Sequence, residues 1–178
     1  MENSEILELA SGIQLLAMDV DGVLTDGSLY FSDQGEELKA FNILDGQGIK
    51  MLHQAGIETA IITGRSSPLT ERRARNLGIR WLYQGREDKA QALTELARSC
   101  SIPISAMAYV GDDLPDLAAI EQAALGISVP NAYHAVRDAA DWCTSQPGGQ
   151  GAVREIADLL LSARGVLEQA LEAYRRPS

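Results

Sequence analysis

Two aspartates, Asp19 and Asp21, stand one residue apart at the end of a short apolar run and are followed at once by Gly22. The run, residues 15–18, is typical of a buried strand. Because side chains two positions apart on a strand point the same way, the two carboxylates would share a face. Like charges in such a place repel each other, and a bound cation would relieve the repulsion. The segment therefore predicts an acidic site where a strand ends, with Gly22 suited to a sharp turn.

A second interpretation of this segment involves no metal. An Asp-x-Asp-Gly segment also fits a strand that ends in an Asx turn, with both carboxylates in water. A calcium loop of the helix–loop–helix kind fits less well, because it needs a ligand at position five and glycine at position six. Here Val23 is at position five and Gly22 at position four. On this stretch alone, the metal site and the Asx turn both remain open.

Two later segments have the same form, in which an apolar run ends in polar residues. The run 57–62 leads to Thr63, and the run 106–110 leads through a glycine to an aspartate-rich turn. Lys89 stands in the first turn of a predicted helix, where its charge opposes the helix dipole, so local helix stability does not explain it. The C-terminal ends of parallel strands lie at one edge of a sheet, so these groups can converge. The side chains that we expect at this edge are Asp19, Asp21, Thr63, Lys89, Asp112, Asp113 and Asp116.

The order of the predicted elements favours an α/β fold. Apolar runs of strand length alternate with helical segments, which is typical of a doubly wound, mostly parallel sheet. Residues 27–41 differ, because two short alternating runs flank a turn at 32–35 and predict a β-hairpin inserted after the first strand. Residues 45–48 are typical of a turn before a helix at 49–54, and residues 146–175 of a loop and a C-terminal helix.

The composition limits the classes of function. The 178 residues are enough for one domain with its own core, and without a linker we expect a single domain over residues 1–178. The formal net charge of −10 argues against nucleic acid or an anionic membrane as the main partner. No apolar run approaches the roughly 20 residues of a membrane span, and no basic region marks a signal peptide. The two cysteines fit no metal or redox spacing, so we expect free thiols and a cytoplasmic protein.

The sequence also limits the kinds of catalytic site. The two histidines, His53 and His134, stand alone, which argues against a zinc site and a Ser-His-Asp triad. No Gly-x-x-x-x-Gly-Lys-Ser/Thr phosphate-binding loop is present. Clustered carboxylates suit a hard cation, for which Mg²⁺ with bound waters is the natural choice. With a metal, a carboxylate, a hydroxyl and a lysine at one edge, phosphoryl transfer is the leading chemistry.

Four motifs, in their order along the chain, resemble the haloacid dehalogenase superfamily of phosphohydrolases. They are Asp19-Val-Asp21-Gly-Val-Leu-Thr, Thr63-Gly-Arg65, Lys89 and Gly111-Asp112-Asp113-Leu-Pro-Asp116. The resemblance implies that Asp19 is the nucleophile and that Asp21 is the general acid and base. It also implies that Thr63 and Lys89 hold the phosphoryl group.

The same resemblance implies a magnesium site. Mg²⁺ would be bound by the carboxylates of Asp19 and Asp112 and by the backbone carbonyl of Asp21. Asp113 and Asp116 would support the metal from behind these ligands. We therefore expect Mg²⁺ as the cofactor.

Further segments resemble one branch of the superfamily, the 3-deoxy-D-manno-octulosonate 8-phosphate (KDO 8-phosphate) phosphatases. They include Gly-Glu-Glu-Leu-Lys-Ala-Phe-Asn at 35–42, Asp-Gly-Gln-Gly at 45–48 and Gly-Gly-Gln-Gly-Ala-Val-Arg-Glu at 148–155. This resemblance implies release of phosphate from KDO 8-phosphate in lipopolysaccharide biosynthesis, through an aspartyl-phosphate. Phosphatases of sialic-acid or KDN 9-phosphates share much of the pattern and remain an alternative.

The resemblance also implies a Rossmann-like sheet and a homotetramer whose hairpins pack together at its centre. The sequence agrees that there is no cap domain, since neither the stretch from Asp21 to Thr63 nor that from Thr63 to Asp112 has room for one. A neighbouring subunit would then help to close the site over a small anionic sugar-acid phosphate.

Basic residues near the predicted site are candidates for contacts to the anionic substrate. We expect Arg65 to contact its carboxylate or sugar, with Gly64 beside it and Arg86 as a further candidate. The alternative interpretation of Arg65 is a solvated surface residue, because arginine side chains are mostly exposed. A solvated helix face is expected for Arg72, Arg73 and Arg75.

Two other classes of protein have a similar set of residues. A phospho-accepting receiver domain carries its acidic pair after the first strand and its acceptor aspartate two strands later. Here the Asp-x-Asp pair is on the first strand and the Asp-Asp pair follows Lys89, so the order argues against a receiver. A non-catalytic regulatory subunit of the same fold is the other alternative, and the intact set of acidic, hydroxyl and basic residues argues against it.

Overall fold

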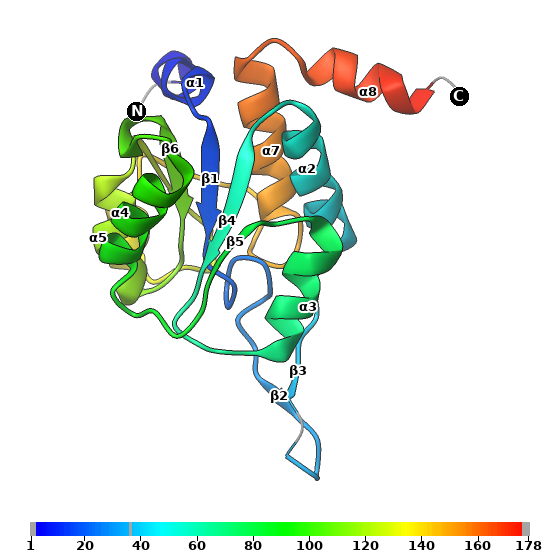
Figure 1. Ribbon diagram of the computed structural model, residues 1–178, viewed down its shortest axis with the longest axis vertical. Helices are drawn as coiled ribbons and strands as arrows, with labels where there is room; N and C mark the ends of the chain where they lie inside the picture. The colour runs from blue at the N-terminus through cyan, green and yellow to red at the C-terminus, as the bar shows by residue number, and fades with distance from the viewer. Residues whose placement is uncertain (1–2, 36, 176–178) are drawn as a thin grey trace.

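The computed structural model describes residues 3–35 and 37–175. Its centre is a six-stranded sheet in the order β5-β4-β1-β6-β7-β8 (Figure 1). Every neighbouring pair in this order is parallel, so the predicted doubly wound parallel sheet is confirmed. The strands are β1 (Leu15–Met18), β4 (Glu58–Ile62), β5 (Trp81–Tyr83), β6 (Met107–Val110), β7 (Leu125–Ser128) and β8 (Trp142–Cys143).

Helices cover both faces of the sheet. The alternation along β1 separates the two cores, because Leu16 and Met18 pack on one side while Leu15 and Ala17 pack on the other. The first core is covered by α1 (Asn3–Ser11), α2 (Ile43–Gln54), α3 (Pro68–Leu77) and α7 (Ala152–Ala163). The second is covered by α4 (Lys89–Cys100), α5 (Leu117–Gln122) and α6 (His134–Ala139), with short 3₁₀ turns η1 (Ile104–Ala106) and η2 (Leu114–Asp116). Among the helices described, none has the length and apolar character needed to cross a membrane.

The helix α2 begins earlier than the sequence predicts. Residues 45–48 were expected as a turn, but they lie within α2, so that prediction is wrong. Asn42 caps the helix by accepting a hydrogen bond from the backbone N–H of Leu44 at 2.7 Å. A Cβ added at Gly48 would lie 3.1 Å from the Cβ of Ala157 in α7. Close packing of α2 against α7 therefore outweighs the poor helix propensity of glycine.

The arginine-rich helix α3 is only partly solvated. It begins at Pro68 after the capping residue Ser67 and ends at Gly78 in the left-handed conformation, which are favoured residues at these positions. However, Arg73 donates to the backbone carbonyl of Asn42 at 2.9 Å and its guanidinium is half-buried. The expectation of a solvated face is therefore wrong for Arg73, although Arg72 and Arg75 are exposed.

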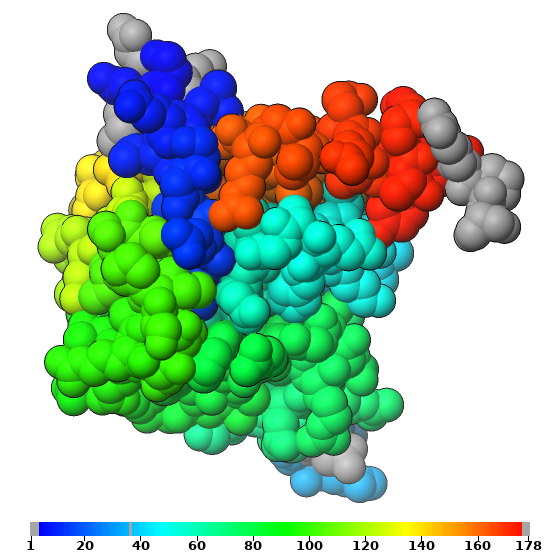
Figure 2. Space-filling view, turned by 45° about the horizontal axis from the view of Figure 1, so that its top comes forward, coloured from blue at the N-terminus to red at the C-terminus, as the bar shows by residue number. Residues whose placement is uncertain are grey.

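The predicted hairpin forms a separate two-stranded antiparallel sheet. Its strands, β2 (Tyr30–Phe31) and β3 (Glu37–Leu38), are shorter than expected. It projects from one end of the molecule, while α8 (Leu167–Arg175) extends at the other (Figure 2). The apolar side chains of Phe31 and Leu38 are 62% and 59% exposed. The hairpin therefore displays apolar surface to which nothing within the described chain packs closely.

No cap domain interrupts the sheet in the residues that the structure describes. Between β1 and β4 the chain adds only the hairpin and α2, and between β4 and β6 it adds α3, β5, α4 and η1. The C-terminal edge of the sheet is thus covered only by loops and the base of the hairpin (Figure 1). The prediction of an α/β fold without a cap is confirmed.

Candidate active site

Three neighbouring strands lead at their C-terminal ends to predicted site residues, and Lys89 joins them from the start of α4. In the sheet, β1 lies between β4 and β6. Asp19 follows β1 and its backbone N–H still pairs with the carbonyl of Val110 at 3.0 Å. Thr63 follows β4, and its backbone N–H donates to the carbonyl of Tyr83 at 2.9 Å. Both residues are thus held by the end of the sheet ladder rather than by a free loop.

Nine of the ten predicted site residues line one cleft of about 310 Å³ at this edge. The exception is Arg86. The nine residues are Asp19, Asp21, Thr63, Gly64, Arg65, Lys89, Asp112, Asp113 and Asp116. A larger hollow of about 670 Å³ lies at the opposite edge, beside α8. Its one charged lining residue, Arg164, donates to two backbone carbonyls, so that hollow offers no comparable set of reactive groups.

Lys89 links the first strand end to the aspartate-rich turn. Its ammonium lies 2.9 Å from Asp19 Oδ2 and 2.6 Å from Asp116 Oδ1. Burial alone would lower the pKa of Lys89, but the two carboxylates outweigh it and raise that pKa, so the ammonium stays charged. This pairing explains a lysine at the start of α4, where the helix dipole disfavours it.

Asp116 is fully buried and already has a partner at each oxygen. Its Oδ1 accepts from Lys89 and from the hydroxyl of Tyr109, each at 2.6 Å. Its Oδ2 accepts from the backbone N–H groups of Asp112 and Asp113, at 3.1 and 3.2 Å. With these bonds it shapes the turn after β6, which suits the predicted supporting role. Tyr109 was missed by sequence reasoning, although a tyrosine in an otherwise small, apolar strand was a usable signal.

Two buried carboxylate oxygens in the cleft have no hydrogen-bond partner. They are Asp19 Oδ1 and Asp112 Oδ1. Oxygens of Asp19, Asp112 and Asp116 lie within 4.8 Å of one another. Burial and the neighbouring carboxylates raise the pKa of Asp19 to about 6 and that of Asp112 to about 8. Unpaired carboxylate oxygens that repel each other in a dry site are suited to a divalent cation with oxygen ligands, so the residues fit Mg²⁺.

Gly22 is required where the two acidic segments meet. It adopts a φ of +94°, in the left-handed region. A Cβ at this position would lie 1.9 Å from Asp112 Oδ2. Any side chain here would therefore displace the Asp112 carboxylate, which explains the glycine of the Asp-x-Asp-Gly segment.

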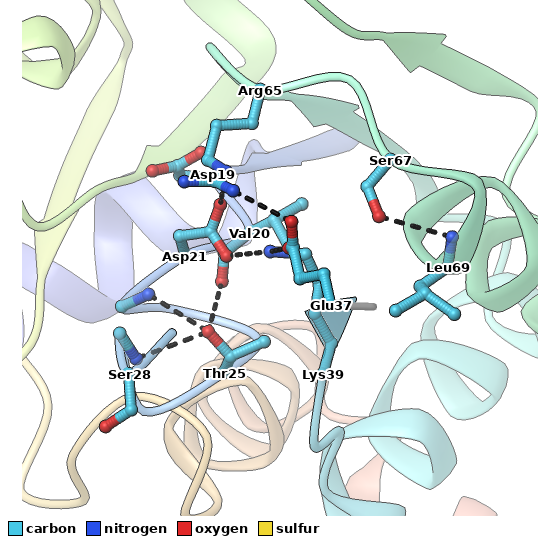
Figure 3. A network of polar contacts seen from close by, with 12 residues as sticks. Asp19, Val20, Asp21, Thr25, Ser28, Glu37, Lys39, Arg65, Ser67 and Leu69 are labelled. Atoms are coloured by element: carbon cyan, nitrogen blue, oxygen red, sulfur yellow. Dashed lines mark hydrogen bonds and ion pairs between the residues drawn. The ribbon is translucent and has the colours of Figure 1, made fainter. Parts of the chain in front are cut away.

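Asp21 lies at the mouth of the cleft, away from the buried cluster, and contacts the hairpin. Its Oδ1 forms an ion pair with the ammonium of Lys39, and its Oδ2 lies 3.9 Å from Arg65 Nε. Glu37 joins the two cations, at 3.1 Å from Lys39 Nζ and 2.8 Å from Arg65 (Figure 3). Sequence reasoning missed Glu37 and Lys39, because only the packed hairpin brings them to the site.

The glycine-rich segment near the C-terminus braces the loop after β1. Asn131 donates to the carbonyl of Gly22 at 2.9 Å and accepts from the N–H of Gly148 at 2.7 Å. Gly149 N–H donates to the carbonyl of Val23 at 2.8 Å. A Cβ at Gly148 would lie 1.7 Å from the Gly22 carbonyl oxygen, so only glycine allows this approach. Asn131 is a further residue that the sequence did not reveal.

Arg86 and Asp113 are predicted site residues that bind partners close to them in the sequence. Arg86 binds Asp88 at 2.7 Å and Glu95 at 2.7 Å, and it does not line the cleft. Its role as a substrate contact stays a prediction, and its ion pairs favour a structural role. Asp113 caps η2 by accepting from the N–H of Leu114 at 2.8 Å, so that it shapes the acidic turn.

A parallel sheet with acidic strand ends, a buried lysine and no cap defines the class of protein. Residues 34–124 match the haloacid dehalogenase-like hydrolase family. The chain belongs to this family, as the four sequence motifs predict.

Individual proteins of known sequence or structure can be compared with this chain. The chain is 46% identical over 168 residues to the 3-deoxy-D-manno-octulosonate 8-phosphate phosphatase of Escherichia coli, covering 94% of this chain and 89% of that one. The phosphatase of the same name from Moraxella catarrhalis, solved with magnesium, phosphate and KDO, is 46% identical with a TM-score of 0.95, covering 97% and 99% of the two chains. A probable phosphatase of the YrbI family from Pseudomonas syringae is 48% identical with a TM-score of 0.96, covering 99% and 100%. This chain is therefore similar to these proteins over nearly its whole length.

Proposed function

We propose that this protein is a Mg²⁺-dependent phosphatase that releases phosphate from KDO 8-phosphate in lipopolysaccharide biosynthesis. The observation that carries the reaction type is the pair of unpartnered buried oxygens of Asp19 and Asp112 beside the charged Lys89. The substrate is supported by the relatives, which are named for this activity and match 94% of the chain. The single-domain organisation and the cytoplasmic location belong to the same proposal.

In the proposed first step, Asp19 attacks the phosphorus atom of the substrate. A bond forms between a carboxylate oxygen of Asp19 and phosphorus, and the bond from phosphorus to the sugar oxygen breaks. Lys89 and the hydroxyl of Thr63 hold the phosphoryl oxygens, and the lysine balances their charge in a buried site. Asp21, at the cleft mouth, gives its proton to the departing sugar oxygen.

In the proposed second step, water releases the phosphate from Asp19. Asp21, now a carboxylate, takes a proton from the water as the water attacks phosphorus. The aspartyl-phosphate bond breaks, inorganic phosphate forms, and Asp21 is protonated again for the next cycle. The partly exposed side chain of Asp21 lines the cleft, which gives it access to both the sugar oxygen and water.

Magnesium would be held by Asp19, Asp112 and the backbone carbonyl of Asp21. When bound, Mg²⁺ supplies positive charge that neutralises the transferring phosphoryl oxygens. Asp116 keeps the turn that carries Asp112 in place through its two backbone hydrogen bonds. Asp113 shapes the same turn.

Arg65 and Gly64 are the proposed contacts to the sugar acid. Arg65 lines the cleft and is 44% exposed, so its guanidinium can reach an incoming carboxylate. Its present partners are the carboxylates of Glu37 and Asp21, which a substrate carboxylate would resemble in charge and shape.

A homotetramer is the proposed assembly, built through the hairpin. Exposed apolar side chains on the hairpin offer the surface: Leu29, Tyr30, Phe31 and Leu38. An isolated two-stranded hairpin is marginally stable in water, so burial against other copies would stabilise it. Sedimentation at micromolar concentration tests this point, and a monomer would contradict it.

Phosphate release tests the proposed function directly. The substrates are KDO 8-phosphate, a sialic-acid-type 9-phosphate and hexose 6-phosphate, each with Mg²⁺ and with EDTA. We expect strong preference for KDO 8-phosphate, lost with EDTA. Preference for the 9-phosphate would keep the mechanism and change the substrate. No release from any of the three would favour a non-catalytic protein.

A further inference from the structure

Four charged side chains alternate in sign across the mouth of the cleft. Asp21 and Arg65 come from the ends of the central strands, whereas Glu37 and Lys39 come from the hairpin (Figure 3). Lys39 pairs with both Asp21 and Glu37, and Arg65 pairs with Glu37 at 2.8 Å. The hairpin thus supplies two of the three charges that surround Asp21, the proposed acid and base.

Lys39 is the least exposed member of this group. Its side chain is 3% exposed, compared with 22% for Asp21 and 44% for Arg65. An enclosed ammonium with a direct carboxylate partner has little freedom to move, whereas an exposed arginine 3.9 Å away constrains Asp21 weakly. Lys39 is therefore the contact that fixes where the Asp21 carboxylate lies.

Lys39 is not placed to contact the substrate itself. It does not line the cleft that holds Asp19, Asp112 and Lys89. Its ammonium is already shared between Asp21 and Glu37. Lys39 can therefore act on the reaction through Asp21, or through Glu37 and its partner Arg65, and only the first route concerns proton transfer.

We propose that Lys39 is a positioning residue of the active site, by which the hairpin holds the Asp21 carboxylate at the cleft mouth for proton transfer to the sugar oxygen. This inference rests on the proposed function, because it gives a further residue to the same reaction. It also gives the hairpin a part in the chemistry as well as a surface for assembly.

The test compares two leaving groups in the variant Lys39→Met. An alkyl phosphate such as KDO 8-phosphate needs a proton at the leaving oxygen, whereas p-nitrophenyl phosphate leaves as a stable anion. The value of kcat/KM reports the steps up to phosphoryl transfer. We expect Lys39→Met to lower kcat/KM for the alkyl phosphate by about 10- to 100-fold, within the usual contribution of acid–base catalysis, and to lower the aryl value less than about threefold. An equal loss on both substrates would overturn the proposal, since it would mark a purely structural role.

Two further variants make the comparison specific. Lys50→Met removes the same charge from an exposed position on α2, and it should keep the wild-type ratio between the two substrates. In an Asp21→Asn background, Lys39→Met should cost almost nothing further on the alkyl phosphate, because Asp21 no longer acts. A full additional loss in that background would contradict the proposed route through Asp21.

A crystal structure of Lys39→Met separates this inference from the proposed function. We expect the Asp21 carboxylate to leave its position while Asp19 and Asp116 keep theirs. If Asp21 stays in place, the inference fails, whether or not the wild-type protein acts on KDO 8-phosphate. If the wild-type protein releases no phosphate, the proposed function fails, and the position of Asp21 still decides what Lys39 does.

Discussion

The active-site cleft has two charged regions that differ in burial and in the elements that carry them. The inner region joins Asp19, Lys89 and Asp116, whose side chains are 8%, 4% and 0% exposed, on the ends of the central strands and the first turn of α4. The outer region joins Asp21 and Arg65, with side chains 22% and 44% exposed, to Glu37 and Lys39 of the hairpin, with side chains 24% and 3% exposed. The inner groups are thus fixed by the sheet, and the outer groups depend on an element with little packing of its own.

This difference suits the two regions to different parts of the substrate. In the inner region Lys89 pairs with Asp19 and Asp116 in a buried setting, where electrostatic interactions are strong and little reorganisation is needed. Such a region suits the phosphoryl group, which is the same in every substrate. In the outer region water screens the exposed Arg65, which can exchange its partners, and this suits the variable sugar acid.

The variant Asp19→Asn should have the largest effect. An amide oxygen is a poor nucleophile, so turnover should fall on the order of 10⁴-fold or more, as for other lost nucleophiles. Phosphate release with Mg²⁺ measures the loss, and circular dichroism checks that the fold remains. Near-normal activity would remove Asp19 from its proposed role.

The variant Asp21→Asn should have the next largest effect and should leave the inner region intact. Loss of the acid and base should lower turnover by about 10²- to 10⁴-fold. Mg²⁺ should still raise the thermal midpoint, because the proposed ligand at this position is a backbone carbonyl. Loss of Mg²⁺ binding in this variant would show that the two regions are not separate.

The inner region was largely predictable from the sequence, and the physical reason is topological. Strands that alternate with helices form a parallel sheet, so residues such as Asp19, Thr63 and Asp112 at strand ends must meet at one edge. Lys89 stood out because its charge was unfavourable for its own helix. No side-chain packing had to be known for either conclusion.

The outer region was much less predictable, because it depends on how the hairpin packs against the body. Lys39 lies in a segment that the sequence marked as an alternating strand and as part of a family resemblance, and neither signal indicates its contact with Asp21. Asn131 and Gly148 likewise meet the loop after β1 only through the tertiary fold. The early start of α2 has the same origin, since packing on α7 outweighs the local preference for a turn.

The variant Asp112→Asn should stabilise the metal-free protein while removing its response to Mg²⁺. Folding raises the pKa of Asp112 from its usual 3.8 to about 8, mainly through burial and then through Asp19 and Asp116. Without metal, this group therefore costs stability as the pH rises from about 4 to about 8, because the unfolded chain loses its proton first. At pH 7 in EDTA the neutral amide should raise Tm by about 2–4 °C for each kcal/mol of penalty relieved.

The control for this prediction is Asp113→Asn, which changes the same charge on the neighbouring residue. Asp113 caps η2 and its side chain is not buried, so the stabilisation should be absent. If Asp112→Asn lowered Tm in EDTA, the Asp112 carboxylate would not be destabilising in the metal-free protein. If the variant kept the rise in Tm with Mg²⁺, Asp112 would not be a metal ligand.

The smallest effects on activity are expected for substitutions where the cleft meets solvent. Two arginines can be compared there, because Arg65 lines the cleft and Arg86 does not. Arg65→Gln should raise KM for KDO 8-phosphate by about tenfold with little change in kcat, because a charged hydrogen bond to the sugar acid is lost. Arg86→Gln should change KM less than about twofold, because its guanidinium is held by Asp88 and Glu95 of its own chain. Steady-state kinetics on both variants measures the two values. A tenfold rise in KM for Arg86→Gln would show that the substrate also contacts Arg86, outside the cleft. No change in KM for Arg65→Gln would show that Arg65 contacts Glu37 and Asp21 but not the substrate.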